Sequence, residues 1–518
     1  TTIIGTGVLL FAEHPALRSI AVLSVTGMVV LPLIALGVQP AVFRFFVSDR
    51  ARKGLHPFTL RSLLISFFAF VSFLSGCVLL IVLYVLFRVL PLARTVRQRA
   101  FRTVIMLFTG SLVYVMANTR KEIHSFREAI RHRPSIVIAN HNSFIDILAM
   151  LMIHPQVVMM TNRWVWNSPF FGATVRFAGH LRTEDDVKVN VERARQLVAE
   201  GCSIVIFPEG TRSRDGRIGR FHKGPFYLAE QLKLPIVPVV LHGFGYAMRK
   251  GDWMLKDARL SMHTLPAIEW DDPRFGAGYS ERGKKVTAWF RGEYERIRAA
   301  RETPRYFREQ LVRGSIYKGP VLEWYTRVKS RIDTGLHELI HSRIAPAARV
   351  ADLGCGHGML SYLLHFSAPE RSILGVDHDE EKLRIAENCF DRGTTLTFVR
   401  ADLEHYDPPP ADAYILKDVL HYLTPDAQRH LLARCAARLS PGGSIFLRDG
   451  FSDDAARHGR TRLTELLSTG IGFNRANQEL YFPRRTALEN FARVHGLHLE
   501  WATDARITSN ALAIITRP

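Results

Sequence analysis

Cysteines are few for the length of the sequence, and no two of them are closely spaced. The 518 residues contain five, without a CxxC motif, at Cys77, Cys202, Cys355, Cys389 and Cys435. This separation argues against a disulfide framework and against a zinc site built from cysteines. We expect reduced thiols in a cytoplasmic setting and no bound metal.

Acidic residues are scarce in the first part of the chain. Residues 1–134 contain sixteen lysines and arginines but four acids, so they hold twelve of the twenty excess positive charges. Basic residues that flank long apolar runs are typical of proteins at membranes, where anionic lipids attract them. The distribution therefore indicates a membrane partner, and we expect no binding to nucleic acid.

Two apolar runs near the start predict membrane segments. Residues 20–38 are about long enough for a helix that crosses a bilayer, and residues 62–87 carry no charge at all. Basic residues lie on both sides of the second run, at Arg50, Arg52, Lys53, Arg88, Arg94, Arg97, Arg99 and Arg102. We favour a run that re-enters near Gly76 or forms a tilted anchor. The alternative is that the run crosses the membrane and that residues 101–116 bring the chain back.

From about residue 135 the pattern changes to short β-rich runs that alternate with helical stretches. It predicts strands at residues 135–139, 202–207 and 236–241, and helices at residues 143–153, 187–200 and 284–301. A second alternation of this kind begins at Arg349 and continues to the end. The predicted fold class is therefore α/β, with membrane helices ahead of two α/β domains.

A histidine and an aspartate follow the first of these strands, in Asn140-His141-Asn142-Ser143-Phe144-Ile145-Asp146. Asp146 falls one helical turn into the next segment, so its carboxylate can reach back to the imidazole of His141. An imidazole held by a carboxylate can take a proton from an alcohol, because the partner fixes the tautomer and stabilises the imidazolium. The alternative is a histidine that only satisfies a backbone group at a strand end.

A second motif, Phe207-Pro208-Glu209-Gly210-Thr211-Arg212, follows another predicted strand. Arg212 can bind a phosphate through two hydrogen bonds, Gly210 permits close approach to the backbone, and Thr211 adds a donor. Taken alone, this segment could be a charged surface loop. Its combination with the histidine motif favours a site that transfers a group to a phosphorylated alcohol.

Asn-His-x4-Asp followed by Phe-Pro-Glu-Gly-Thr-Arg resembles the lysophospholipid and glycerol-phosphate acyltransferase family, over about residues 95–300. The resemblance implies that His141 is the general base, that Asp146 orients it, and that residues 209–212, Glu209 included, bind the phosphate of the acyl acceptor. It also implies acyl-CoA or acyl carrier protein as the donor and a membrane lipid as the acceptor. His180 stands where the family usually has an apolar or small residue.

A glycine-rich turn marks the start of the second α/β region. Asp352-Leu353-Gly354-Cys355-Gly356-His357-Gly358 ends a predicted strand, and glycines there let a nucleotide-like ligand approach the backbone. The next strand ends at Asp377, whose carboxylate can accept two ribose hydroxyls, and a third ends before Asp402. A pyrophosphate-binding dehydrogenase remains an alternative, although its spacing would be Gly-x-Gly-x-x-Gly.

This region resembles the class I S-adenosylmethionine-dependent methyltransferases over about residues 315–518. The resemblance implies a Rossmann-like fold with S-adenosyl-L-methionine as cofactor, held by Asp352, Gly354, Gly356, Gly358, Asp377 and Asp402. Methylation of a hydroxyl also needs a base, for which His421 and Asp418 are candidates. Equally, His421 could be a packing residue beside the cofactor and Asp418 a solvated acid. No Asn-Pro-Pro-Tyr element is present, so we expect a small molecule or lipid precursor as acceptor.

The first residues, Gly5-Thr6-Gly7 with His14-Pro15 ahead of the first apolar run, resemble the tail of an MMPL-type exporter. The chain begins at Thr1 without an initiator methionine, so we expect it to be part of a longer protein. The order of parts resembles trifunctional bacterial proteins made of exporter, acyltransferase and methyltransferase.

This resemblance implies membrane segments in residues 1–92, an acyltransferase domain in 93–303 and a methyltransferase domain in 304–518. It places the protein at the bacterial inner membrane, with both catalytic domains facing the cytoplasm and the exporter portion as a possible partner. Two alternatives are pigment or aryl-lipid assembly coupled to an exporter, and a membrane scaffold with a non-catalytic methyltransferase-like domain.

Overall fold

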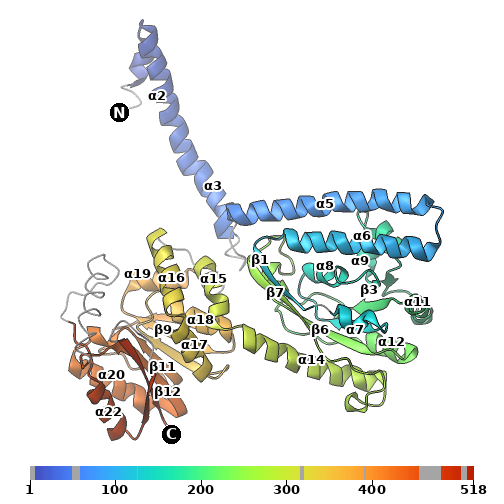
Figure 1. The fold of residues 1–518 in the computed structure, drawn as a ribbon. Coiled ribbons are helices and arrows are strands. Elements are labelled where there is room, and N and C mark those ends of the chain that lie inside the picture. The colour runs from blue at the N-terminus through green and yellow to red at the C-terminus, as the bar shows by residue number, and fades with distance from the viewer. Residues whose placement is uncertain are drawn as a thin grey trace. The chain divides into compact units, whose positions relative to one another are not determined.

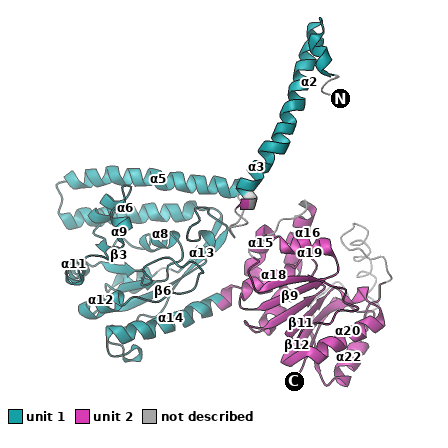
Figure 2. Cartoon of the chain, turned by 180° about the vertical axis from the view of Figure 1, so that it is seen from behind, with its two compact units in different colours: residues 1–48, 57–298 teal, residues 49–56, 299–518 magenta. Residues whose placement is uncertain are grey.

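The computed structural model divides the chain into two compact units, residues 1–48 with 57–298 and residues 49–56 with 299–518 (Figures 1 and 2). It describes residues 6–49, 59–124, 126–314, 320–389, 392–453, 480–502 and 510–518. The basic residues Arg50, Arg52 and Lys53, which bear on membrane topology, lie outside the described residues, as does Gly5.

Two helices near the start are long and apolar enough to cross a membrane, by length and composition. The first covers Pro15–Phe46 and comprises α2 (Pro15–Leu33), the π-helical turn Ile34–Val38, α3 (Gln39–Phe43) and the start of a second π-helical turn, Arg44–Ser48. The second is α5 (Leu60–Val89), in which residues 62–87 carry no charge. Both apolar runs predicted from the sequence are therefore helical.

The predicted re-entry near Gly76 is wrong, because α5 continues through this residue without a break. Helix α6 (Arg94–Val115) runs back along α5, as Figures 1 and 2 show. Gly76 serves this contact: a Cβ at its position would lie 1.9 Å from the ring of Phe108. The glycine therefore marks a close helix contact.

The first unit is built on a seven-stranded sheet in the order β1-β7-β6-β2-β5-β3-β4. All neighbours are parallel except β6 and β7. The strands are β1 (Thr119–Ile123), β2 (Ile136–Ala139), β3 (Val157–Thr161), β4 (Leu181–Arg182), β5 (Ser203–Ile206), β6 (Ile236–His242) and β7 (Ala258–Thr264). The predicted strands at 135–139, 202–207 and 236–241 are confirmed as β2, β5 and β6.

Helices cover both faces of this sheet, so its central strands are buried on both sides. In β2, Ile136 and Ile138 join one apolar core, while Val137 and Ala139 join the core on the opposite face. The helices are α7 (Arg127–Arg131), α8 (Ile145–Leu151), α9 (Arg163–Trp166), α10 (Gly172–Phe177), α11 (Val187–Ala199), α12 (Gly224–Leu232), α13 (Phe244–Ala247) and α14 (Tyr279–Arg301).

The second unit also has a seven-stranded sheet, in the order β10-β9-β8-β11-β12-β14-β13. The first five strands are parallel, and β14 is antiparallel to both of its neighbours. The strands are β8 (Arg349–Leu353), β9 (Ser372–Asp377), β10 (Leu396–Arg400), β11 (Ala411–Lys417), β12 (Leu439–Gly450), β13 (His498–Ala502) and β14 (Asn510–Thr516).

Strand order reverses at β8, which pairs with β9 on one side and with β11 on the other. Open α/β sheets bind ligands at the carboxyl ends of the strands beside such a switch point. This Rossmann-like arrangement confirms the predicted fold class. The helices of the unit are α15 (Pro304–Gly314), α16 (Pro320–Ile332), α17 (Thr334–Arg343), α18 (Met359–Ser367), α19 (Glu380–Glu387), α20 (Pro425–Arg438) and α22 (Arg485–Val494).

Candidate active sites

The first candidate site lies where β2 ends, and its central pair is His141 and Asp146. Asp146 is fully buried in α8, and its Oδ2 lies 2.9 Å from Nδ1 of His141. The same oxygen accepts the backbone N–H groups of Asn142 (2.6 Å) and Ser143 (2.7 Å). Two backbone donors therefore fix the carboxylate, and the carboxylate fixes the imidazole, as the spacing of the motif predicts.

Two further contacts hold His141 in place. Its ring stacks on that of Phe207, with centroids 4.1 Å apart and an interplanar angle of 15°. Asn140, just before it, bonds to both the N–H and the C=O of Leu241, which ties the end of β2 to the end of β6. With Nδ1 engaged by Asp146, Nε2 is the nitrogen that can take a proton from a substrate.

Glu209 connects the two motifs. Its Oε1 accepts the N–H of His141 (2.9 Å), and its Oε2 accepts the N–H of Gly219 (2.8 Å). Burial raises the pKa of Glu209, against the opposing effect of these two hydrogen bonds. Because both oxygens are bound to backbone donors, the geometry favours a positioning role for Glu209 over the predicted contact with the substrate phosphate.

The loop that follows Glu209 contains the predicted phosphate ligands. Gly210 has a φ of +69°, which favours glycine, while Thr211 is exposed and Arg212 is half-buried. Nζ of Lys250 donates to Thr211 Oγ1 (2.8 Å) and to Arg212 O (2.9 Å). Sequence reasoning missed Lys250, because it lies 38 residues beyond Arg212 and no motif surrounds it. It places a second cation beside the loop.

His180, the departure from the acyltransferase pattern, is a packing residue. It is buried, and its Nδ1 accepts the N–H of Met159 in β3 (2.8 Å). Burial, aided by the charge of Arg102, lowers the pKa of His180 to about 4. The imidazole is therefore neutral at ordinary pH and serves to hold β3 in place.

In the second unit, the glycine-rich turn after β8 has the shape of a cofactor site. A Cβ at Gly354 would lie 2.5 Å from Val419, so the turn packs tightly on that side. Gly356 has a φ of +57° and no atom within 4 Å of the position of a Cβ, so the turn is open to a ligand at this residue. Gly358 has a φ of +72° and precedes α18. This cradle fits S-adenosyl-L-methionine.

Two aspartates support this turn. Asp377 is buried at the end of β9, and its carboxylate accepts the N–H groups of Gly356 (2.8 Å) and Asp379 (2.9 Å). It keeps acceptor capacity for ribose hydroxyls, because a carboxylate offers about four lone-pair sites. Asp352 is buried and accepts a hydrogen bond from the Ser361 hydroxyl in α18. Burial raises its pKa to about 6, and its place beneath the turn favours a positioning role.

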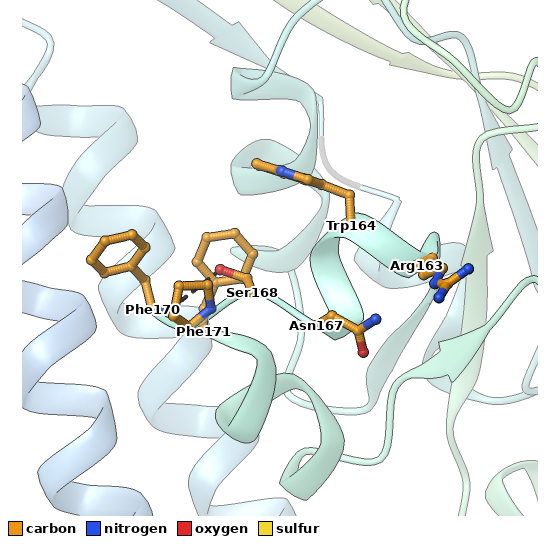
Figure 3. Close-up of a pocket in the computed structure, with 7 residues that line it drawn as sticks. Arg163, Trp164, Asn167, Ser168, Phe170 and Phe171 are labelled. Carbon is orange, nitrogen blue, oxygen red and sulfur yellow. Dashed lines mark hydrogen bonds between the residues drawn. The ribbon is translucent and has the colours of Figure 1, made fainter.

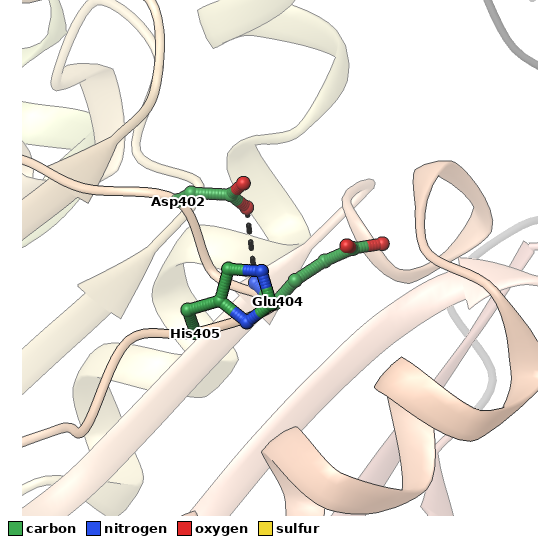
Figure 4. A group of neighbouring side chains, drawn as sticks. All are labelled: Asp402, Glu404 and His405. Carbon is green, nitrogen blue, oxygen red and sulfur yellow. Dashed lines mark hydrogen bonds between the residues drawn. The ribbon is translucent and has the colours of Figure 1, made fainter.

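Asp402 lies at the same edge of the sheet, because the N–H of Ala401 donates to Asp377 O (3.0 Å). Its side chain is exposed and forms a cluster with Glu404 and His405 (Figure 4). One ligand atom from each lies within 4.8 Å of the others, so the cluster could hold a metal ion, which the sequence analysis did not expect. Asp402 Oδ1 accepts the N–H of Glu404 (3.0 Å).

The two candidate bases of the second unit have different surroundings. His421 is buried, its Nδ1 lies 2.7 Å from Oδ1 of Asp449 in β12, and its ring stacks on Phe482. This repeats the arrangement of His141 and Asp146. Sequence reasoning found His421 but missed Asp449, which lies 28 residues away on the neighbouring strand.

Asp418 is a poor candidate for a base, which corrects its prediction as an alternative to His421. It pairs with Arg448, with Lys417 (3.5 Å) and with Lys329 (3.6 Å). Burial opposes ionisation, but these three cations hold the pKa of Asp418 below its usual value. Its φ of +55° belongs to a turn, and its contacts are those of a buried ionic network.

Comparisons with known proteins support both units. Residues 121–242 match the family model described as Acyltransferase, and residues 350–443 match one described as Methyltransferase domain. The chain therefore carries an acyltransferase domain and a methyltransferase domain.

Among curated relatives, a 1-acyl-sn-glycerol-3-phosphate acyltransferase from Cocos nucifera is 35% identical over 145 residues, 27% of this chain and 47% of that protein. The alpha form from Homo sapiens is 29% identical over 155 residues, 29% of this chain and 55% of that protein. The chain thus spans about half the length of these relatives.

Solved structures show likeness to the same two kinds of protein. PlsC from Thermotoga maritima, a 1-acyl-sn-glycerophosphate acyltransferase, is 19% identical with a TM-score of 0.41 and covers 46% of this chain and 97% of that one. An O-methyltransferase family protein from Burkholderia thailandensis is 19% identical with a TM-score of 0.30, over 37% and 60% of the two chains.

Proposed function

We propose that the first unit transfers an acyl chain from a thioester, on coenzyme A or on acyl carrier protein, to a hydroxyl of a glycerol-phosphate or lysophospholipid acceptor. The pairing of His141 with Asp146 carries this proposal. Nε2 of His141 takes the proton of the acceptor hydroxyl, and the oxygen attacks the thioester carbonyl. The thiolate then leaves and receives the proton from the imidazolium, whose charge Asp146 stabilises.

The loop beside the histidine supports a phosphorylated acceptor. Arg212 offers paired donors, Thr211 a hydroxyl and Lys250 an ammonium group, and the two side chains of Thr211 and Lys250 are 2.8 Å apart. Glu209 joins this loop to the backbone of His141. A phosphate bound by these groups would therefore keep a fixed distance from the base.

We propose further that the protein acts at the bacterial inner membrane, on a lipid acceptor, with its active sites in the cytoplasm. The two apolar helices Pro15–Phe46 and Leu60–Val89 and the basic helix α6 support attachment to a bilayer with anionic lipids. The resemblance of the first residues to an exporter makes a transporter portion a candidate partner, in lipid or aryl-lipid assembly.

Acyl transfer is tested with the purified full chain and its His141→Ala variant in vesicles. Release of thiol from oleoyl-CoA or oleoyl carrier protein is followed with lysophosphatidate as acceptor. We expect transfer by the wild type, and in the variant a rate of transfer at least a hundredfold lower with an unchanged melting temperature. A variant that keeps its activity would contradict the role of His141.

The pairing of His421 with Asp449 favours a second activity, methyl transfer to a hydroxyl of a small molecule or lipid precursor. S-adenosyl-L-methionine would be held by the turn Gly354 to Gly358 and by Asp377, and it supplies the methyl group. Nδ1 of His421 is bonded to Asp449, so the proton of the acceptor hydroxyl would go to Nε2. Isothermal titration of the full chain with this cofactor tests the site; no binding, or equal binding by an Asp377→Ala variant, would contradict it.

A further inference from the structure

An apolar hollow lies on the first unit, at α9 and the loop that leads to α10. It is more open than enclosed and has a volume of about 530 Å³. Figure 3 shows the side chains that line it: Arg163, Trp164, Asn167, Ser168, Pro169, Phe170 and Phe171. Trp164 is 67% exposed and Phe170 is 55% exposed, which is costly for large aromatic side chains in water. A concave apolar surface of this size is typical of a ligand site.

A row of aromatic rings connects this hollow with the catalytic motif. The ring of Trp164 lies 5.8 Å from that of Phe171, and Phe171 lies 6.5 Å from Phe73 of α5. Phe73 in turn lies 5.6 Å from Phe144, which stands between His141 and Asp146 in the sequence. Apolar contacts therefore run without a break from the hollow to the loop that carries the base.

The same helix that supplies Phe73 is one of the two candidate membrane spans. On α5, Phe67, Phe68 and Phe70 are each about 60% exposed, and α10 packs against this helix. Tryptophan is enriched where a protein meets the surface of a bilayer, and phenylalanine is favourable in its apolar interior. The hollow thus lies next to the part of the unit that is suited to contact lipid.

We propose that this hollow holds the acyl chain already present on the acceptor lipid while its free hydroxyl reaches His141. The inference rests on the proposed acyl transfer and names the part of the substrate that the hollow recognises. An acceptor lipid has its chain in the bilayer, beside α5, whereas the donor chain arrives on a water-soluble carrier. Continuity with α5 therefore favours the acceptor chain over the donor chain.

The test compares acceptors of increasing chain length, used as monomers so that the chain leaves water on binding. Each methylene that enters an apolar site improves binding by up to about fourfold. For the wild-type full chain, kcat/KM should therefore rise from butanoyl to decanoyl lysophosphatidate at a fixed concentration of decanoyl-CoA. In the double variant Trp164→Ser/Phe170→Ser the rise should flatten, with at least a tenfold loss for the decanoyl acceptor.

Both substituted side chains are largely exposed, so the double variant should fold, and its melting temperature checks this. Trp324→Ser is the matched control, because Trp324 is 64% exposed on α16 of the second unit. In this control, kcat/KM should rise with acceptor chain length as it does in the wild type. The butanoyl acceptor should react equally well with all three proteins. A second series varies the donor from butanoyl- to dodecanoyl-CoA with the butanoyl acceptor.

Each outcome is informative. Equal slopes for the wild type and the double variant in the acceptor series would overturn the inference and leave the proposed acyl transfer intact. If the double variant instead lost the rise of kcat/KM with donor chain length, the hollow would hold the donor chain, and the inference would also be overturned. No transfer by the wild type to any acceptor would overturn the proposed function, and this inference with it.

Discussion

Replacement of Asp146 by asparagine separates the charge of the carboxylate from its geometry. Oδ2 of Asp146 receives all three hydrogen bonds, from His141 Nδ1 and from the N–H groups of Asn142 and Ser143. Oδ1 is buried and has no hydrogen-bond partner among the described residues. An asparagine can therefore place its oxygen where Oδ2 was and its NH2 group where Oδ1 was, and so keep every bond.

The variant then keeps these hydrogen bonds but loses the negative charge and gains a buried NH2 group without a partner among the described residues. A hydrogen bond to a charged group contributes about 1.5–3 kcal/mol, against about 1 kcal/mol for a neutral one. The imidazolium that forms on His141 would lose roughly 0.5–2 kcal/mol of stabilisation, which lowers kcat for acyl transfer about two- to thirtyfold. The buried NH2 group would cost about 1–3 kcal/mol of folding stability.

The assay is thiol release from oleoyl-CoA at saturating lysophosphatidate, with melting recorded for each protein. Asp146→Ala removes the acceptor for all three donors and should lose more activity than Asp146→Asn. Asp185→Asn is the control, because Asp185 pairs with Arg193 (2.6 Å) away from the motif. Wild-type activity in Asp146→Asn would refute a role for the charge, and a loss as large as that of His141→Ala would refute the preserved geometry.

Three further predictions concern other residues. Arg212→Lys should raise KM for lysophosphatidate about tenfold with little change in kcat, because lysine cannot bind phosphate with paired donors; equal KM values in steady-state kinetics would contradict this. His421→Gln should slow methylation of a hydroxyl at least a hundredfold without changing the Kd for S-adenosyl-L-methionine, measured by titration. Asp352 has a pKa raised to about 6, so the stability that its neutral form provides is present below about pH 4 and is lost as pH rises through 6. Asp352→Asn should therefore stabilise the second unit by about 3 kcal/mol at pH 7.5, seen as slower hydrogen exchange in β8; no difference between pH 4 and pH 7.5 would contradict the shift.

The sequence was informative where a contact is local or a strand is buried. The apolar runs that became β2, β5 and β6 stand out because both faces of these strands are covered. The bond between His141 and Asp146 joins residues five apart, so the short turn from β2 into α8 brings them together. Strand β7 was missed, although the alternation of its Ala-Arg-Leu-Ser-Met-His-Thr would have indicated a half-buried strand.

The role of Glu209 could not be read from the motif that contains it. A carboxylate beside an arginine and a threonine looks like part of a binding loop, and only the fold shows which donors it meets. Those donors belong to His141, 68 residues before it, and to Gly219, ten residues after it. Long-range contacts of this kind depend on the sheet order, which no short motif encodes.

The same reasoning explains why both candidate bases have a partner on a different element. In each unit the histidine lies just beyond the carboxyl end of a parallel strand, where loops from neighbouring strands meet. For His141 the partner lies on the next helix, and for His421 it is Asp449 on the adjacent strand β12. The motif alone was sufficient for His141, whereas the partner of His421 could be identified only from the neighbouring strand. The buried carboxylate within hydrogen-bonding distance is what distinguishes these two from His180, whose ring meets a backbone N–H.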